Sequence, residues 1–97
     1  MDDSLDFYSL KTVWTPRDEA AVLKMDYQSR AELAKIINCE GLLVDLSMDQ
    51  HTEVRLGVAQ NIHTPLRTLN RLSQEDLCIT IKDTAKKTLL NLPCRRN

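Results

Sequence analysis

The chain has 97 residues, which suffices for one domain and is too short for two. Its composition, 42% hydrophobic and 28% charged, is ordinary for a globular protein, and its longest apolar run is far below the roughly 20 residues of a membrane helix. Three cysteines at wide spacings, without a Cys-x-x-Cys pair, exclude the common zinc and redox motifs. We therefore expect a single soluble domain over residues 1–97, in the reducing cytoplasm.

The net charge of −1 hides an asymmetry between the two halves. Residues 1–53 carry five basic and eleven acidic side chains, a net of −6, whereas residues 54–97 carry eight basic and three acidic, a net of +5. Such asymmetry can mark a nucleic-acid face, an attraction between the ends of one domain, or a head-to-tail contact between copies. An attraction within the domain or between copies is favoured over a nucleic-acid face, because a net charge of +5 gives only a weak field for binding a duplex.

Residues 1–14 hold three of the four aromatic side chains and form a flexible or capping N-terminal segment. Phe7, Leu10 and Trp14 fall at helical spacing, which indicates an amphipathic turn or two. These rings either fold back over an open end of the core or dock on a partner. The first alternative is favoured, because large apolar rings prefer burial.

Residues 15–93 show helix punctuation almost throughout. Thr15-Pro16 is a typical helix start, and we expect this helix to run to about Met25. Ser29 and Glu32 have the spacing of a capping box, so we expect Ser29 to cap the next helix. Asn38 is suited to end that helix in the left-handed conformation.

The second half continues the same pattern. A short apolar stripe follows Gly41, a helix runs through Val54 to Asn61, and Thr64-Pro65 repeats the Thr-Pro start. The last helix stops at Asn91 and Pro93. It carries apolar residues at four-residue steps, at Leu77, Ile81, Ala85 and Leu89. The prediction is an all-α fold of about five to six short helices.

Part of the sequence recurs at an offset of 26 residues. Leu46-Ser47-Met48-Asp49 is followed by Leu72-Ser73-Gln74-Glu75, and asparagine closes three predicted helices. A period in this range is typical of solenoids, in which helix pairs stack because one pair cannot bury its apolar face alone. We therefore expect residues 15–93 to form a short α-solenoid of stacked helix pairs.

The stretch from Leu46 to Ser73 resembles the variant leucine-rich repeat, through Val54-Arg55, Val58-Ala59, Asn61 and Thr64-Pro65. That family forms an α-solenoid related in shape to HEAT repeats, and neighbouring units of this chain match it loosely. Some members bind an iron–sulfur cluster through clustered cysteines, but only Cys39 precedes the clear repeat, so no cluster is carried over.

Two residues of this unit have expected structural roles. Asn61 tolerates a positive φ after its helix. Arg55 lies in a first helical turn, where the dipole disfavours a cation, so Asp49 or Glu53 should offset its charge. A bridge between repeat units is favoured over ligand binding for Arg55.

No residue cluster has the pattern of a catalytic site. Gly41 and Gly57 are the only glycines, which rules out a glycine-rich phosphate loop. His51 and His63 lie in predicted connections without further ligands at metal-binding spacing, and Glu40 should raise the pKa of Cys39. We expect no enzyme activity, no cofactor and no metal.

The fold then implies binding. In the first interpretation the chain is a protein–protein interaction module, an adaptor or regulator, that uses the face of Arg55, Arg67 and Arg71 or the segment from Phe7 to Trp14. An exposed end of the stack can also pair with a second copy, giving a homodimer.

Two alternatives stay open. Lys82, Lys86 and Lys87 in the basic half would contact the backbone of a nucleic acid, although the chain is slightly acidic and stacking aromatics are missing from that half. The acidic half would instead sequester a basic partner.

Overall fold

The computed structural model describes the backbone of residues 3–92 and the side chains of residues 6–92. This part of the chain folds into helices and contains no strand, which confirms the predicted all-α class. Its seven helices exceed the expected five to six, because residues 3–9 also form one. The helices are α1 (Asp3–Ser9), α2 (Pro16–Leu23), α3 (Tyr27–Ala34), α4 (Glu40–Leu46), α5 (Thr52–Gln60), α6 (Leu66–Glu75) and α7 (Ile79–Asn91).

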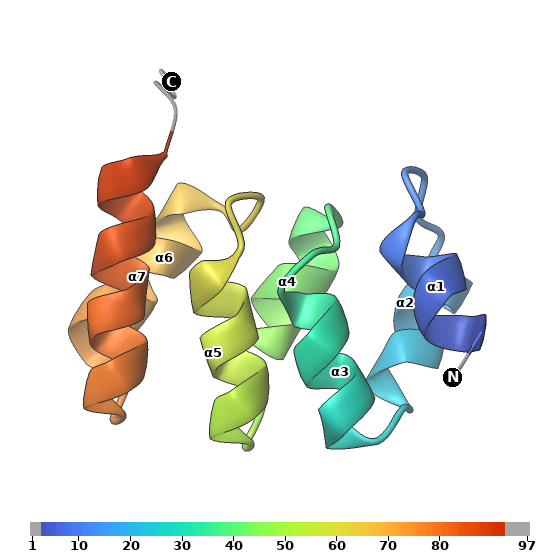
Figure 1. Ribbon diagram of the computed structural model, residues 1–97, viewed down its shortest axis with the longest axis horizontal. Helices are drawn as coiled ribbons and strands as arrows, with labels where there is room; N and C mark the ends of the chain where they lie inside the picture. The colour runs from blue at the N-terminus through green and yellow to red at the C-terminus, as the bar shows by residue number, and fades with distance from the viewer. Residues whose placement is uncertain (1–2, 93–97) are drawn as a thin grey trace.

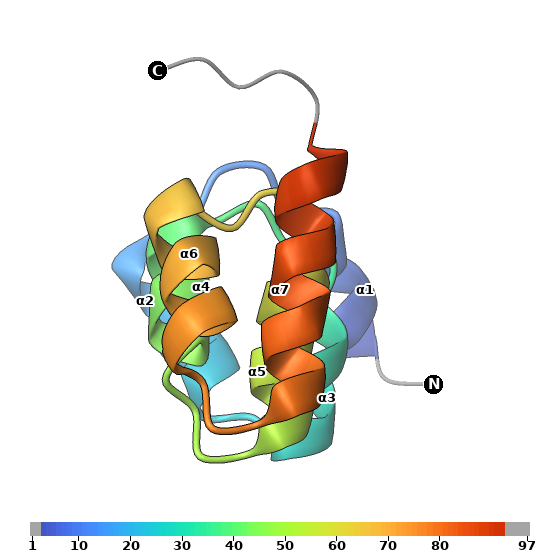
Figure 2. The same ribbon diagram turned by 90° about the vertical axis from the view of Figure 1, so that its left-hand side faces the viewer.

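The helices alternate between two layers. Figure 1 shows α1, α3, α5 and α7 in front and α2, α4 and α6 behind, and Figure 2 shows the same two layers from the side. The largest contacts join α6 to α7, α3 to α5 and α5 to α7, whereas no comparable contact joins α4 to α6 among the described residues. One layer is therefore closely packed and the other is open.

The core lies between the layers and consists mainly of leucine, valine and alanine. Leu33, Leu43, Leu46, Val58 and Leu72 are all within 1% of complete burial. Helices α3 to α6 each contribute two or three such residues, so each depends on its neighbours for burial.

Close packing of α3 against α5 depends on Gly57. A Cβ atom at this position would lie 2.8 Å from Ala31 O and 2.8 Å from Ala34 Cβ, closer than real contacts allow. Only glycine therefore permits the two backbones to approach this far.

The helix starts were predicted with mixed success. Thr15 caps α2 as expected: its Oγ1 accepts from Asp18 N at 3.2 Å, and Asp18 Oδ2 accepts from Thr15 N at 3.0 Å. The prediction for Ser29 was wrong, because Asp26 caps α3 and its carboxylate accepts from Ser29 N at 3.1 Å. Ser29 thus lies inside the helix.

Two helix ends also differ from the prediction. Helix α3 ends at Ala34, four residues before Asn38. Helix α7 begins after Leu77, which lies in the connection from α6 and is fully exposed instead of joining the apolar face. The last helix does end at Asn91, while the expected stop at Pro93 lies outside the described residues.

Candidate functional site

Arginine and aspartate link successive helix pairs along one edge of the molecule. Arg30, the fourth residue of α3, donates from Nε to Asp49 Oδ2 at 2.8 Å and from Nη2 to Asp49 Oδ1 at 3.3 Å. Its Nη1 donates to Met25 O in the preceding connection. One guanidinium therefore joins the connection before α3 to the connection before α5.

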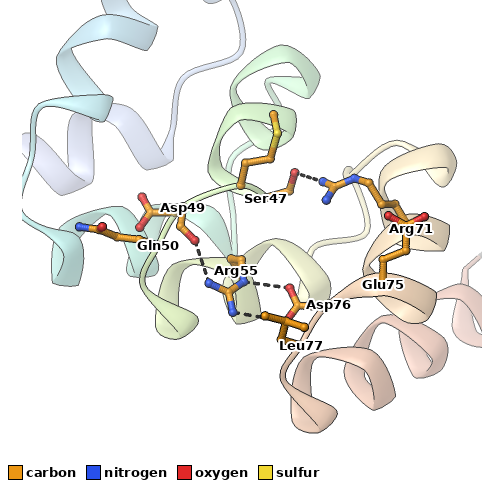
Figure 3. A pocket seen from close by; sticks show the side chains of 9 residues that line it. Ser47, Asp49, Gln50, Arg55, Arg71, Glu75, Asp76 and Leu77 are labelled. Carbon is orange, nitrogen blue, oxygen red and sulfur yellow. Dashed lines mark hydrogen bonds and ion pairs between the residues drawn. The ribbon is translucent and has the colours of Figure 1, made fainter.

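Arg55, the fourth residue of α5, repeats this arrangement two helices later in the chain. Its Nε and Nη2 donate to Asp76 at 2.8 and 3.3 Å, and its Nη1 donates to Asp49 O at 2.8 Å, as Figure 3 shows. Arg55 therefore joins two connections, and Asp76 supplies the carboxylate that was expected from Asp49 or Glu53. We call the Arg30–Asp49 and Arg55–Asp76 pairs the arginine–aspartate ladder.

The carboxylates of the ladder are fixed by their own connections. Asp49 Oδ1 accepts from His51 N, and Asp76 Oδ1 accepts from Cys78 N, both at 2.9 Å. Burial opposes the charge of Asp49, but hydrogen bonds from Arg30 and His51 outweigh it, so the pKa of Asp49 lies below its ordinary value. The ladder is thus a preorganised structural element.

The histidine of this connection also has a structural contact. His51 stacks on Tyr27 with ring centroids 4.2 Å apart and planes 3° from parallel, and its Nδ1 lies 3.1 Å from Asp49 Oδ1. The other histidine, His63, is exposed.

Side-chain bonds to helix ends form a second repeated element. Asn61 is buried, and its Nδ2 donates to Ala34 O at 2.9 Å and to Ile37 O at 2.8 Å. Thr88 Oγ1 donates in the same way to Ala59 O in the next unit. The predicted positive φ of Asn61 was wrong: its φ is −87°, and no described residue has a positive φ.

Helices α4 and α6 border an open groove. It consists of two adjoining hollows of about 520 and 360 Å³ that share Arg71. Val44 and Thr68 line the first hollow, while the exposed side chains of Met48 and Leu77 lie beside the second. We call this feature the α4–α6 groove.

Two of the predicted binding residues lie in this groove. Arg67 is exposed, and Arg71 reaches across from α6 to donate to the buried Ser47 Oγ on α4 (Figure 3). Neither forms an ion pair with a described side chain, in contrast to Arg30 and Arg55. Arg55 lines only the smaller hollow, and its guanidinium group is paired with Asp76.

The predicted aromatic segment lies at the opposite end of the molecule from α6 and α7 (Figure 1). Trp14 is half-buried, stacks on Tyr8 with centroids 5.9 Å apart, and donates from Nε1 to Asn38 Oδ1 at 3.0 Å. Phe7 remains 58% exposed. The expected packing over the core thus holds for Tyr8 and Trp14, whereas Phe7 remains exposed.

The lysines of the alternative interpretation lie on α7. Lys86 and Lys87 are exposed and Lys82 is half-buried, at the helix position that Arg55 occupies in α5. Lys86 follows the exposed Asp83 by three residues, so this helix does not present a uniformly basic face.

A metal site in residues 6–92 would require several of their titratable side chains to lie close together. No three His, Cys, Asp or Glu side chains in this range are grouped as a metal would require. Burial raises the pKa of the Cys39 thiol, with Glu19 adding to the effect in place of the predicted Glu40. None of the described helices is long and apolar enough to cross a membrane.

Comparison with known proteins identifies no family for this chain. No protein-family model, no characterised protein and no solved structure matches the chain. The sequence analysis assigned no contact to Arg30, Asp76 or the groove residue Thr68. A signal existed for Arg30, because it lies at the same distance from its helix start as Arg55.

Proposed function

We propose that this chain is a non-enzymatic protein–protein interaction module that binds a partner segment in the α4–α6 groove. The observation that carries the proposal is the pair of arginines, Arg67 and Arg71, that lines the groove without an ion-pair partner among the described residues. The segment that fits combines acidic and apolar side chains.

The charge of the larger hollow supports an acidic segment there, whereas Asp49, Glu75 and Asp76 line the smaller hollow beside two arginines. Glu40 is the one acidic side chain that lines the larger hollow, beside two arginines. Guanidinium groups bind carboxylates through two parallel hydrogen bonds, so this pair selects a carboxylate by geometry as well as charge.

The walls support apolar contacts beside the charges. Val44, Pro65 and Thr68 line the larger hollow, whose surface is mainly apolar. Met48 and Leu77 line the smaller hollow and are 64% and 100% exposed. Apolar anchors next to charged contacts are the usual anatomy of a protein-binding surface.

The proposal includes the architecture. Alternating layers, the repeated arginine–aspartate pairs and the matching bonds of Asn61 and Thr88 support a short HEAT-like α-solenoid. The same repeats support the resemblance to the variant leucine-rich repeat. Solenoids of this kind offer extended surfaces between helices, which suits an adaptor or regulator.

A peptide selection tests the proposal. A library of random peptides is displayed and selected on the wild-type protein, and the affinities of the selected peptides are measured by fluorescence anisotropy. We expect sequences that combine Asp or Glu with apolar residues. Arg67→Glu should weaken binding at least about tenfold, the equivalent of ~1.4 kcal/mol, because it repels the acidic side chains.

Arg17→Glu is the matched control, since Arg17 is an exposed arginine on α2 that lies outside the groove. We expect its effect on affinity to stay within about twofold. Peptides without acidic residues, or equal losses in both variants, contradict the proposal. Binding of a DNA or RNA oligonucleotide that Lys86→Glu abolishes and Arg67→Glu preserves would transfer the function to α7.

A further inference from the structure

Helix α6 carries three charged side chains along the edge of the α4–α6 groove. Arg67, Arg71 and Glu75 follow one another at steps of four residues, so they lie on one ridge of the helix. Arg67 lines the larger hollow, Glu75 lines the smaller one, and Arg71 lines both. Figure 3 shows Arg71 and Glu75 on this helix beside the smaller hollow. The two ends of the groove therefore differ in the sign of the charge that α6 presents.

Glu75 is the acidic side chain of the smaller hollow that forms no ion pair with a described residue. Asp49 and Asp76 also line this hollow, but Arg30 and Arg55 bind their carboxylates in the arginine–aspartate ladder. Glu75 is exposed and has no such partner in the described part of the chain. Its carboxylate is therefore the one in this hollow that can pair with a bound cation.

Helix stability does not explain the charges at the two ends of α6. Arg67 is the second residue of the helix and Glu75 is the last. The helix dipole favours acidic side chains in the first turn and basic side chains in the last turn, so both charges have the unfavourable sign. An acidic group bound beside Arg67 and a basic group bound beside Glu75 would supply the charges that the helix lacks.

The surroundings of Glu75 suit a long basic side chain. Met48 and Leu77 line the same hollow, and both side chains are mainly exposed to solvent. Lysine and arginine lay their aliphatic stems along apolar surface and keep their charged groups at its edge. The stem of such a residue would cover Met48 and Leu77, while its charged group meets Glu75.

The length of α6 sets the spacing of the partner's charges. Glu75 follows Arg67 by eight residues, and an α-helix rises about 1.5 Å per residue, so their backbones are about 12 Å apart. An extended segment rises about 3.3 Å per residue and turns alternate side chains to the same face, so this distance corresponds to about four residues. A segment that contacts both ends therefore has its two charges four positions apart.

We propose that the smaller hollow is a subsite for a lysine or arginine, so that the α4–α6 groove selects an extended segment with an acidic and a basic residue four positions apart. Arg67 and Arg71 hold the acidic residue, and Glu75 determines the specificity for the basic one. The inference rests on the proposed function, because it assigns the second half of the same groove.

Exchange of charge between Glu75 and the peptide tests this proposal. Selection on the wild type should enrich lysine or arginine four positions from the acidic residue. In a synthetic peptide of this pattern, replacing the lysine by glutamate should weaken binding at least about tenfold, measured by fluorescence anisotropy. Moving the lysine to three positions from the acidic residue turns it to the opposite face, and should lose most of its contribution.

Glu75→Lys should reverse the preference, so that the peptide with glutamate in place of lysine binds more tightly than the original. Glu75→Gln removes the charge without adding another and should bind both peptides within about twofold of each other. Asp83→Lys is the matched control, because Asp83 is an exposed carboxylate on α7 outside the groove, and it should keep the wild-type preference. Circular dichroism establishes that each variant is folded.

A preference for lysine that persists in Glu75→Lys overturns the proposal. So does a selection that yields acidic and apolar residues without a basic residue at the fixed spacing. Arg67→Glu distinguishes the two failures, because it tests the acidic contact alone: peptides that lose affinity in Arg67→Glu and ignore Glu75 leave the proposed function standing without this subsite.

Discussion

The two helix layers use arginine in opposite ways. In the closely packed layer, Arg30 and Arg55 each meet an aspartate of the next connection and a backbone carbonyl of the preceding one. In the open layer, Arg67 and Arg71 border a groove and meet no carboxylate among the described residues. Arginine thus holds elements of the fold together in one layer and borders an open groove in the other.

Burial explains why this difference matters. The side chains of Arg55 and Asp76 are 16% and 5% exposed, so removing either leaves the other charge in a poorly solvated site. Arg67 is exposed, so its removal leaves no such charge behind. Mutations in the two layers should therefore separate stability from binding.

The largest expected effect is that of Arg55→Ala. This variant leaves the nearly buried Asp76 carboxylate and the Asp49 carbonyl without their donor, and should lower the free energy of unfolding by about 3 kcal/mol. Urea denaturation followed by circular dichroism measures the change. A loss below about 0.5 kcal/mol, the usual range of surface substitutions, would show that the arginine–aspartate ladder does not stabilise the fold.

Asp49→Asn should lower the free energy of unfolding by about 2 kcal/mol at pH 7, because it removes the charge that Arg30 contacts. The pKa of Asp49 is depressed in the folded state, so its charge stabilises the fold above the unfolded-state pKa, and this contribution is lost as the pH falls through the folded-state pKa. The wild-type and variant stabilities should converge in acid. Parallel curves down to the lowest pH at which both fold would contradict this.

Gly57→Ala probes the packing of α3 against α5. The added methyl group meets Ala31 O and Ala34 Cβ and should destabilise the protein by about 1–3 kcal/mol, even though alanine is the better helix former. Thermal unfolding reports the change. An increase in stability would mean that the two helices separate without cost.

Gly41→Ala is the corresponding change in the open layer and should have the smallest effect. A Cβ atom there lies 3.7 Å from Glu19 Oε1, an ordinary contact, so the gain in helix propensity should stabilise the protein by about 0.5–1 kcal/mol. The same thermal measurement gives the opposite sign from Gly57→Ala. Destabilisation by both substitutions would remove the distinction between the layers.

The sequence revealed those features that depend on neighbouring residues. Thr15 and Asp18 are three residues apart, and their reciprocal cap forms as predicted. The same reasoning failed at Ser29, because Asp26 three residues earlier is an equally suitable cap and local rules do not rank the two starts.

Contacts between units were beyond such reasoning. Asn61 was assigned a local role at a helix end, but its amide bonds to Ala34 and Ile37, more than twenty residues away. Asp76, the residue directly after α6, pairs with Arg55, which lies 21 residues earlier in the chain. The groove itself depends on the spacing of helices, which no local pattern encodes.

The most direct test of the account measures stability and peptide binding together for Arg55→Ala and Arg67→Ala. The account predicts that Arg67→Ala keeps its free energy of unfolding within about 0.5 kcal/mol and loses affinity for a selected acidic peptide. It predicts that Arg55→Ala loses stability and, where it is still folded, binds the peptide. Full binding by Arg67→Ala, or equal loss of stability in both variants, would contradict the account.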